Sequence, residues 1–153
     1  MELGVVLNSE KINLSDDVLE KKDIIVIPKL WKNETEYIDI ESAMILKEIR
    51  LKGKEIEIAN RGHEVVYSDF HGGEYELALF VLKNMALPIL IGIIANRIDK
   101  KIEKYKMDKK EEPSNVLIKE PKIKIKYYNL DKKEYIEIEG SASEVKKEIA
   151  DVI

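Results

Sequence analysis

The sequence predicts an α/β fold with a small mixed-sheet head (a βαβ unit plus a hairpin), a long central apolar helix kinked near Pro88, and a C-terminal ββα subdomain. Three patterns lead to this prediction. Short runs of β-branched residues alternate with helical patterns in the first half of the chain. A long apolar stretch follows, and two runs of alternating apolar and charged residues come after it. We therefore expect a head over 1–73, a helix over 74–106, a charged linker over 107–120 and a ββα tail over 121–153.

The head begins with a predicted strand and a short helix. Leu3–Leu7 is an apolar run without alternation, as expected for a strand that is covered on both faces. Ser15 has the side chain of a helix N-cap, and we expect the helix that it starts to end near Lys22. The next run, Ile24–Ile27, consists of four β-branched residues and is stopped by Pro28. It is the best candidate for the central strand of the head.

An amphipathic helix and a hairpin complete the predicted head. Asp39 is a suitable N-cap for the helix, and Gly53 stands where helices often end. The strand after this helix should lie parallel to the central strand, because the order strand–helix–strand is typical of βαβ units. Glu55–Ala59 and Glu64–Ser68 flank a polar segment, and a two-residue turn at 61–62 aligns their apolar side chains on one face. We therefore predict an antiparallel hairpin.

The centre of the sequence predicts a long helix from Glu74 to about Tyr105. Pro88 lies near its middle and should kink it or split it in two, because proline lacks the amide hydrogen. Met85–Ala95 is apolar around the whole helical circumference. Such a surface has to be covered by the head, by another subunit or by lipid. The predicted function depends on which of the three covers it.

The tail predicts a second antiparallel hairpin, formed by Lys122–Tyr128 and Lys133–Glu139. Pairing the two strands end to end gathers the apolar side chains on one face and places Lys124 opposite Glu137 on the other. The apolar and the charged residues thus favour the same register. A capping box at 141–144 then starts a terminal helix.

Composition narrows the function classes. Because the chain has no cysteine, disulfides, zinc-finger chemistry and thiolate catalysis are excluded. A net charge of −4 argues against general nucleic-acid binding. Basic residues are nevertheless concentrated between Arg97 and Lys126, which indicates either a solvated helix end and linker or a site for an acidic partner. Met1–Ser9 lacks the basic stretch of a secretory signal, so we expect a cytoplasmic location.

The leading functional hypothesis is a non-catalytic interaction module that self-associates through the apolar helix 77–98. The head is large enough to cover one side of this helix but not its whole circumference. Leu87, Ile91 and Ile94 are therefore predicted to form an interface with a second copy of the chain. We expect a homo-oligomer, and a different protein partner is the other way to cover the same surface.

A membrane-associated protein, anchored by helix 77–95, is the second hypothesis. The segment is long enough to cross a bilayer. Lys83 and Asn84 oppose this hypothesis because both would lie in the hydrocarbon, where a central lysine costs about 2.5–3.5 kcal/mol. We therefore place self-association before membrane anchoring.

A polar cluster supports the third hypothesis, a small enzyme or metal-binding protein that uses the region from His63 to Glu74. The cluster consists of His63, Asp69, His71 and Glu74. Imidazole and carboxylate groups are suitable metal ligands. In the predicted hairpin, however, a strand of about six residues separates the two histidines by roughly 20 Å at 3.3 Å per residue. We accordingly assign no metal, no cofactor and no catalytic residue.

Overall fold

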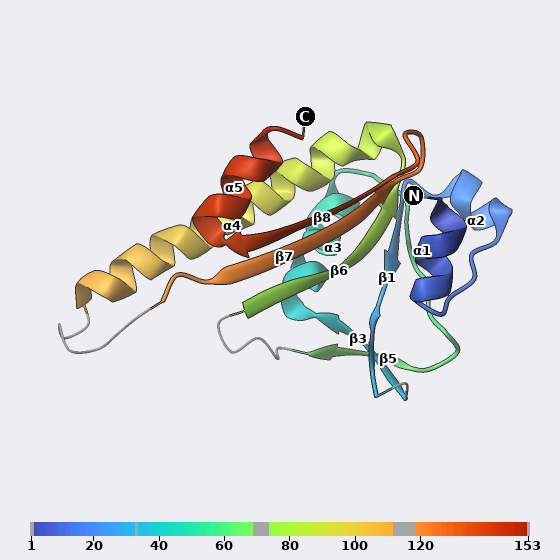
Figure 1. Ribbon diagram of the computed structural model, residues 1–153, viewed down its shortest axis with the longest axis horizontal. Helices are drawn as coiled ribbons and strands as arrows, with labels where there is room; N and C mark the ends of the chain where they lie inside the picture. Colours follow the sequence, from blue (N-terminus) through green and yellow to red (C-terminus); the bar gives the residue numbers. More distant parts are fainter. Residues whose placement is uncertain (1, 33, 69–73, 112–118, 153) are drawn as a thin grey trace.

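The computed structural model describes residues 2–32, 34–68, 74–111 and 119–152. It confirms the predicted fold class, a mixed α/β protein with a long helix and a C-terminal strand–strand–helix unit (Figure 1). The helices are α1 (Leu3–Ser9), α2 (Asp16–Lys21), α3 (Ile40–Leu51), α4 (Leu87–Glu111) and α5 (Ala142–Ala150).

A five-stranded sheet forms the body of the protein. Its strands are, in spatial order, β4 (Ile56–Ile58), β1 (Ile24–Ile27), β6 (Glu74–Leu82), β7 (Lys122–Asn129) and β8 (Glu134–Ser141). The β1–β4 and β6–β7 pairs are parallel, whereas β1–β6 and β7–β8 are antiparallel. The parallel β1–β4 pair confirms the predicted βαβ unit, in which α3 is the helix between the two strands.

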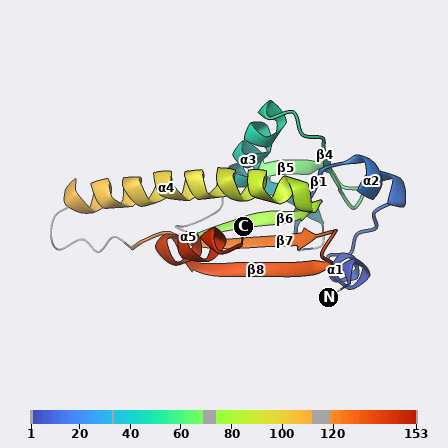
Figure 2. The same cartoon turned by 90° about the horizontal axis from the view of Figure 1, so that it is seen from above.

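Helices cover this sheet on both faces (Figure 2). Ile24 and Val26 of β1 belong to the larger core cluster, which contains residues of α3, α4 and α5. Ile25 and Ile27 point the other way and belong to a smaller cluster with residues of α1 and α2. All four residues of β1 are buried, as the sequence predicted for a central strand.

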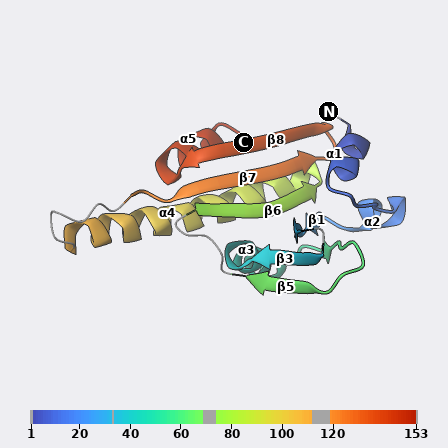
Figure 3. The ribbon, with the colours of Figure 1, turned by 60° about the horizontal axis from the view of Figure 1, so that its bottom comes forward.

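A smaller sheet lies beside the body and consists of β2 (Lys29–Trp31), β3 (Thr35–Asp39) and β5 (Val65–Ser68) (Figure 3). β3 pairs with β2 in the antiparallel and with β5 in the parallel direction. The predicted hairpin of 55–59 with 64–68 is therefore wrong. Its first strand joins β1 in the large sheet, and its second joins β3 in the small one.

A buried ion pair explains why these two strands do not form a hairpin. The Glu36 side chain is fully buried, and its Oε1 atom accepts a hydrogen bond from Arg61 Nη1 at 2.8 Å. The backbone amides of Arg61 and His63 also donate to the Glu36 carboxylate. The chain at 61–63 is thus wrapped around a carboxylate from β3 and makes no tight turn. Arg61 donates further to the carbonyls of Glu10 and Pro28, at 2.7 and 2.9 Å.

The first element is a helix, so the strand predicted over Leu3–Leu7 is wrong. Only one side of this segment is covered, because Val6 and Leu7 are buried while Val5 is exposed. A strand covered on both faces has no exposed apolar residue of this kind. The short helix α2 is confirmed, and Ser15 caps it by accepting a hydrogen bond from the amide of Val18 at 3.2 Å.

The helix predicted from Glu74 is also wrong in its first part. Residues 74–82 form β6, a 3₁₀ turn η1 (Asn84–Ala86) follows, and α4 begins at Leu87. Pro88 is the second residue of α4 and does not lie in the middle of a helix. Proline is favoured in the first turn of a helix because its missing amide hydrogen is not needed there. The predicted kink is therefore replaced by a helix start.

The change from helix to strand removes the predicted membrane anchor. Residues 77–82 are in β6, so no continuous helix covers 77–95. Within the described ranges, every helix is too short or too polar to span a bilayer.

The C-terminal hairpin is confirmed, but its register differs from the prediction by two residues. Tyr128 lies opposite Tyr135 and not opposite Lys133. The turn is longer than predicted because the Asn129 side chain accepts hydrogen bonds from the amides of Asp131 and Lys132. Lys133 follows in a left-handed conformation, with φ of 53°, and belongs to the turn.

A shift of two residues leaves every side chain on its predicted face. Lys124 now lies directly opposite Glu139, yet its Nζ atom is 3.0 Å from Oε1 of Glu137, the residue that was predicted to face it. The capping box of Ser141 and Glu144 at the start of α5 is confirmed.

A charged clamp joins α3 to α4 and fixes their separation at one end. The Glu41 carboxylate accepts hydrogen bonds from Arg97 Nε and from Lys101 Nζ, the latter at 2.8 Å. Burial alone would raise the pKa of Glu41, but the hydrogen bonds and charges of Arg97 and Lys101 outweigh burial and hold this pKa below its ordinary value.

The first prediction concerns the buried pair of Glu36 and Arg61. Arg61→Met should lower the free energy of unfolding by about 3–5 kcal/mol, because the Glu36 carboxylate would stay buried without its cation. Urea unfolding followed by circular dichroism measures this loss. Arg50→Met, on the exposed side of α3, is the matched control and should cost less than about 0.5 kcal/mol. Equal, small losses in both variants would contradict the role of the pair.

The second prediction concerns the acid stability of the Glu41 clamp. The pKa of Glu41 is lower in the folded chain than its ordinary value of 4.5, so the clamp stabilises the fold fully above this pH. The stabilisation is lost as the pH falls through the lowered pKa. We expect the free energy of unfolding of Glu41→Gln to decrease less steeply below this pH than that of the wild type. Urea unfolding across a pH series measures this difference. Glu103→Gln, an exposed change on α4, should leave the profile as steep as in the wild type.

Candidate functional site

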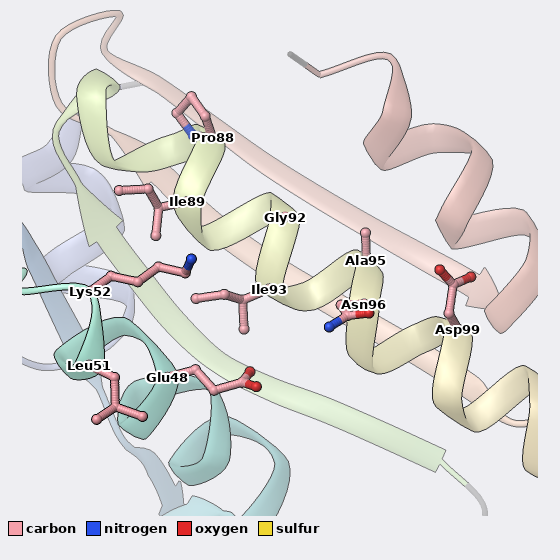
Figure 4. Close-up of a pocket in the computed structure, with 10 residues that line it drawn as sticks. All are labelled: Glu48, Leu51, Lys52, Pro88, Ile89, Gly92, Ile93, Ala95, Asn96 and Asp99. Atoms are coloured by element: carbon pink, nitrogen blue, oxygen red, sulfur yellow. The ribbon is translucent and has the colours of Figure 1, made fainter.

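A groove with a volume of about 860 Å³ lies between the second half of α3 and the first half of α4 (Figure 4). α3 and the residue after it contribute Glu48, Leu51 and Lys52 to its lining. The α4 side runs from Pro88 to Asp99. The two helices are already held together by the Glu41 clamp, so the groove is part of the folded chain and does not need a partner to form it.

The α4 side of the groove is apolar from Pro88 to Ala95, where it contains a dip, and Asn96 and Asp99 add polar groups at its far end. Ile89 and Ala95 are partly buried and Ile93 is buried, while Gly92 between them is exposed. Apart from its two chain neighbours and the backbone of its own helix, a methyl group at Gly92 would meet no atom within 4 Å. The glycine therefore leaves a space on the helix surface that the chain itself does not fill.

Helix α3 carries exposed apolar residues along one face, and one of them, Leu51, lines the groove. Leu51 is 79% exposed, and Ile40 and Met44 are exposed as well. Separations of four and seven positions align side chains on a single face of a helix. Large apolar side chains exposed along one face are typical of surfaces that contact another protein.

Glu48 adds a polar group to this wall. Its carboxylate points toward α4 (Figure 4), and its Oε2 atom is buried without a hydrogen-bond donor among the described residues. A buried acceptor without a donor costs about 1–3 kcal/mol. Lys52 follows one helical turn later, but no ion pair joins the two side chains in the described part of the chain. Lys52 is exposed and extends across the groove toward Ile89 (Figure 4).

The residues predicted as an oligomer interface lie elsewhere. Leu87, Ile91 and Ile94 are 5%, 1% and 1% exposed and belong to the main core, on the side of α4 that faces the sheet. The chain itself thus covers the surface for which a second subunit was invoked. The side of α4 that stays open is the one around Gly92.

The predicted polar cluster is only partly within the described residues. His63 is exposed in the loop between β4 and β5, and Glu74 is exposed at the start of β6. Asp69 and His71 lie outside the described residues. Among the residues that are described, no three His, Cys, Asp or Glu side chains come together in a way that could hold a metal ion.

A second group of charged residues connects the two sheets. Lys29 of β2 donates to the backbone carbonyl of Glu76 in β6, and its Nζ atom is 3.6 Å from the Glu76 carboxylate. Burial lowers the pKa of Lys29 and raises the pKa of the neighbouring Asp39. Asp39 is also the N-cap of α3, through a 2.9 Å hydrogen bond from the amide of Ser42. We interpret this group as a structural junction between the sheets.

The sequence reasoning missed the residues that define the groove. Gly92 was counted as part of an apolar helix surface, and neither Glu48 nor Leu51 was assigned to a site. A glycine within a helix otherwise built from bulky residues was the available signal, because such a glycine costs helix stability and often has a packing or functional reason.

Comparison of the chain with protein-family models, with curated proteins and with solved structures gave no match. The groove between α3 and α4 is therefore interpreted from its own geometry.

Proposed function

We propose that the protein is a non-catalytic interaction module that self-associates through the groove between α3 and α4. One observation carries the proposal: the groove has an open space at Gly92 on its α4 side, and its α3 side presents an exposed leucine, Leu51, beside the opposite charges of Glu48 and Lys52. A partner that inserts an apolar side chain beside Gly92 and pairs with these two charged groups would fill the groove.

A second copy of the chain carries both of the groups that the groove requires. In a twofold contact, both copies bury the same surface patch. If one residue of the first copy contacts another residue of the second, the reverse contact therefore forms as well. Lys52 of one copy is a donor for Glu48 of the other, and the reverse contact forms at the same time. Leu51, exposed at the groove edge, is the side chain that the dip at Gly92 of the other copy can accept. The groove thus carries charges that are complementary to those of a second copy.

The energetic gain comes mainly from apolar burial. Full burial of a leucine side chain that was exposed contributes about 1.5–3 kcal/mol. The twofold symmetry doubles this gain, and each contact of Lys52 with Glu48 of the other copy adds a charge-assisted hydrogen bond. Part of the gain offsets the entropy lost on association, so we expect a reversible dimer.

The third prediction concerns the dip at Gly92. Gly92→Arg places a long side chain at a position where the Cβ atom has open space, and arginine has a higher helix propensity than glycine by nearly 1 kcal/mol. We expect a dimer for the wild type and a monomer of equal or higher melting temperature for Gly92→Arg, measured by size-exclusion chromatography with light scattering. Gly4→Arg makes the same change at an open glycine of α1 and should remain a dimer. A wild type that stays monomeric at high protein concentration would refute the proposal.

The fourth prediction exchanges the charges. Glu48→Lys alone should weaken the dimer because two lysines then meet across the twofold axis at each contact. The double variant Glu48→Lys/Lys52→Glu should restore it, since each pair is re-formed with its signs reversed. Sedimentation equilibrium gives the dissociation constants of all three proteins. A double variant as weak as the single one would show that these two residues do not meet in the dimer.

A further inference from the structure

Cationic side chains line a second, smaller hollow, where α4 passes the starts of β6 and β7. The course of α4 past these two strands can be followed in Figures 1 and 2. Its volume is about 340 Å³. The cations that line it are Arg97, Lys100, Lys101, Lys104 and Lys119. We name this hollow the basic pocket.

The positive charge of the basic pocket is only partly neutralised. Glu41 lies at one side and is already bound by Arg97 and Lys101. Asp108 is the other acidic residue in the lining. Lys100, Lys104 and Lys119 make no hydrogen bond or ion pair within the part of the chain that the structure describes. Three ammonium groups therefore line one hollow, and Asp108 is the single further carboxylate among its described lining residues.

Two tyrosines add flat aromatic walls to the pocket. The Nζ atom of Lys101 lies 3.8 Å from the centroid of the Tyr75 ring, a cation–π contact that fixes this lysine. Tyr105 lines the pocket one helical turn further along α4. A concave site with converging cations and aromatic walls is typical of sites for anionic small molecules.

We propose that the basic pocket binds a small molecule that carries two or more linked phosphate groups. Lysine ammonium groups bind phosphate as point charges. Lys100 and Lys104 are one helical turn apart, with Cβ atoms about 5–6 Å from each other, which suits two neighbouring phosphates better than one. The volume lies at the lower end of the usual range for ligand pockets, about 300–1,000 Å³. The proposal does not depend on self-association, because the groove and the basic pocket have no lining residue in common.

Isothermal titration calorimetry of the full chain with inorganic pyrophosphate and with ADP tests the proposal. We expect saturable binding of both ligands that weakens as the salt concentration rises. Tighter binding of ADP would identify a nucleoside diphosphate as the source of the phosphates, and equal affinity would identify the phosphate chain alone; both results support the site.

Matched variants separate the pocket from general charge effects. Lys100→Glu/Lys104→Glu should weaken binding at least tenfold, and Lys119→Glu on the opposite wall should weaken it as well. Lys106→Glu/Lys110→Glu makes the same charge change with the same spacing on α4, outside the pocket lining, and should stay within twofold of the wild type. The absence of saturable binding of either ligand, or equal losses in the two double variants, would overturn the proposal.

Discussion

The backbone N–H and C=O groups of strand β6 need hydrogen-bond partners inside the protein, because both faces of the strand are buried from Leu77 to Leu82. β1 pairs with one of its edges and β7 with the other. The register shifts between Glu76 and Leu79, and the amide of Ala78 donates to the buried hydroxyl of Ser42 at 2.9 Å. This hydrogen bond attaches α3 to β6. The position of α3, and with it one wall of the groove, thus depends on how a single buried strand completes its hydrogen bonds.

The Glu41 clamp lies between two different surfaces of the long helix α4. Toward its start, α4 presents an open apolar side to α3 around Gly92, and this side forms the groove. Further along, α4 presents lysines to the starts of β6 and β7, and these form the basic pocket. Arg97 and Lys101 bind Glu41 at the boundary. Because the clamp holds α3 against α4, it positions one wall of the groove and one wall of the basic pocket.

Short-range signals predicted the elements that depend on neighbouring residues. The caps at Ser15 and Ser141 and the buried run of β1 are local, and the structure has all of them. The parallel β1–β4 pair is not local, but the order strand–helix–strand predicted it. Residues 77–82 are different, since a short run of consecutive apolar residues fits a buried strand as well as a buried helix. The pairing of β5 with β3 could not be predicted either, because it depends on the contact between Glu36 and Arg61, which are 25 positions apart. The groove could not be predicted for a related reason. Tertiary packing decides which side of α4 the sheet covers. In a helix segment that is apolar all round, sequence periodicity does not indicate that side.

The parallel pairing of β6 with β7 also sets an order of events during synthesis. All of α4 and the segment after it separate the two strands, so β7 leaves the ribosome about 40 residues after β6, roughly 2–8 s later at about 5–20 residues per second. For this interval β6 can pair with β1 alone and presents an unpaired, strongly apolar edge. Such an edge is a template for pairing with other chains. Helix α4 can form during this interval, but it covers one face of the sheet and not this edge. The nascent protein therefore passes through an aggregation-prone stage that ends only when the C-terminal hairpin has been synthesised.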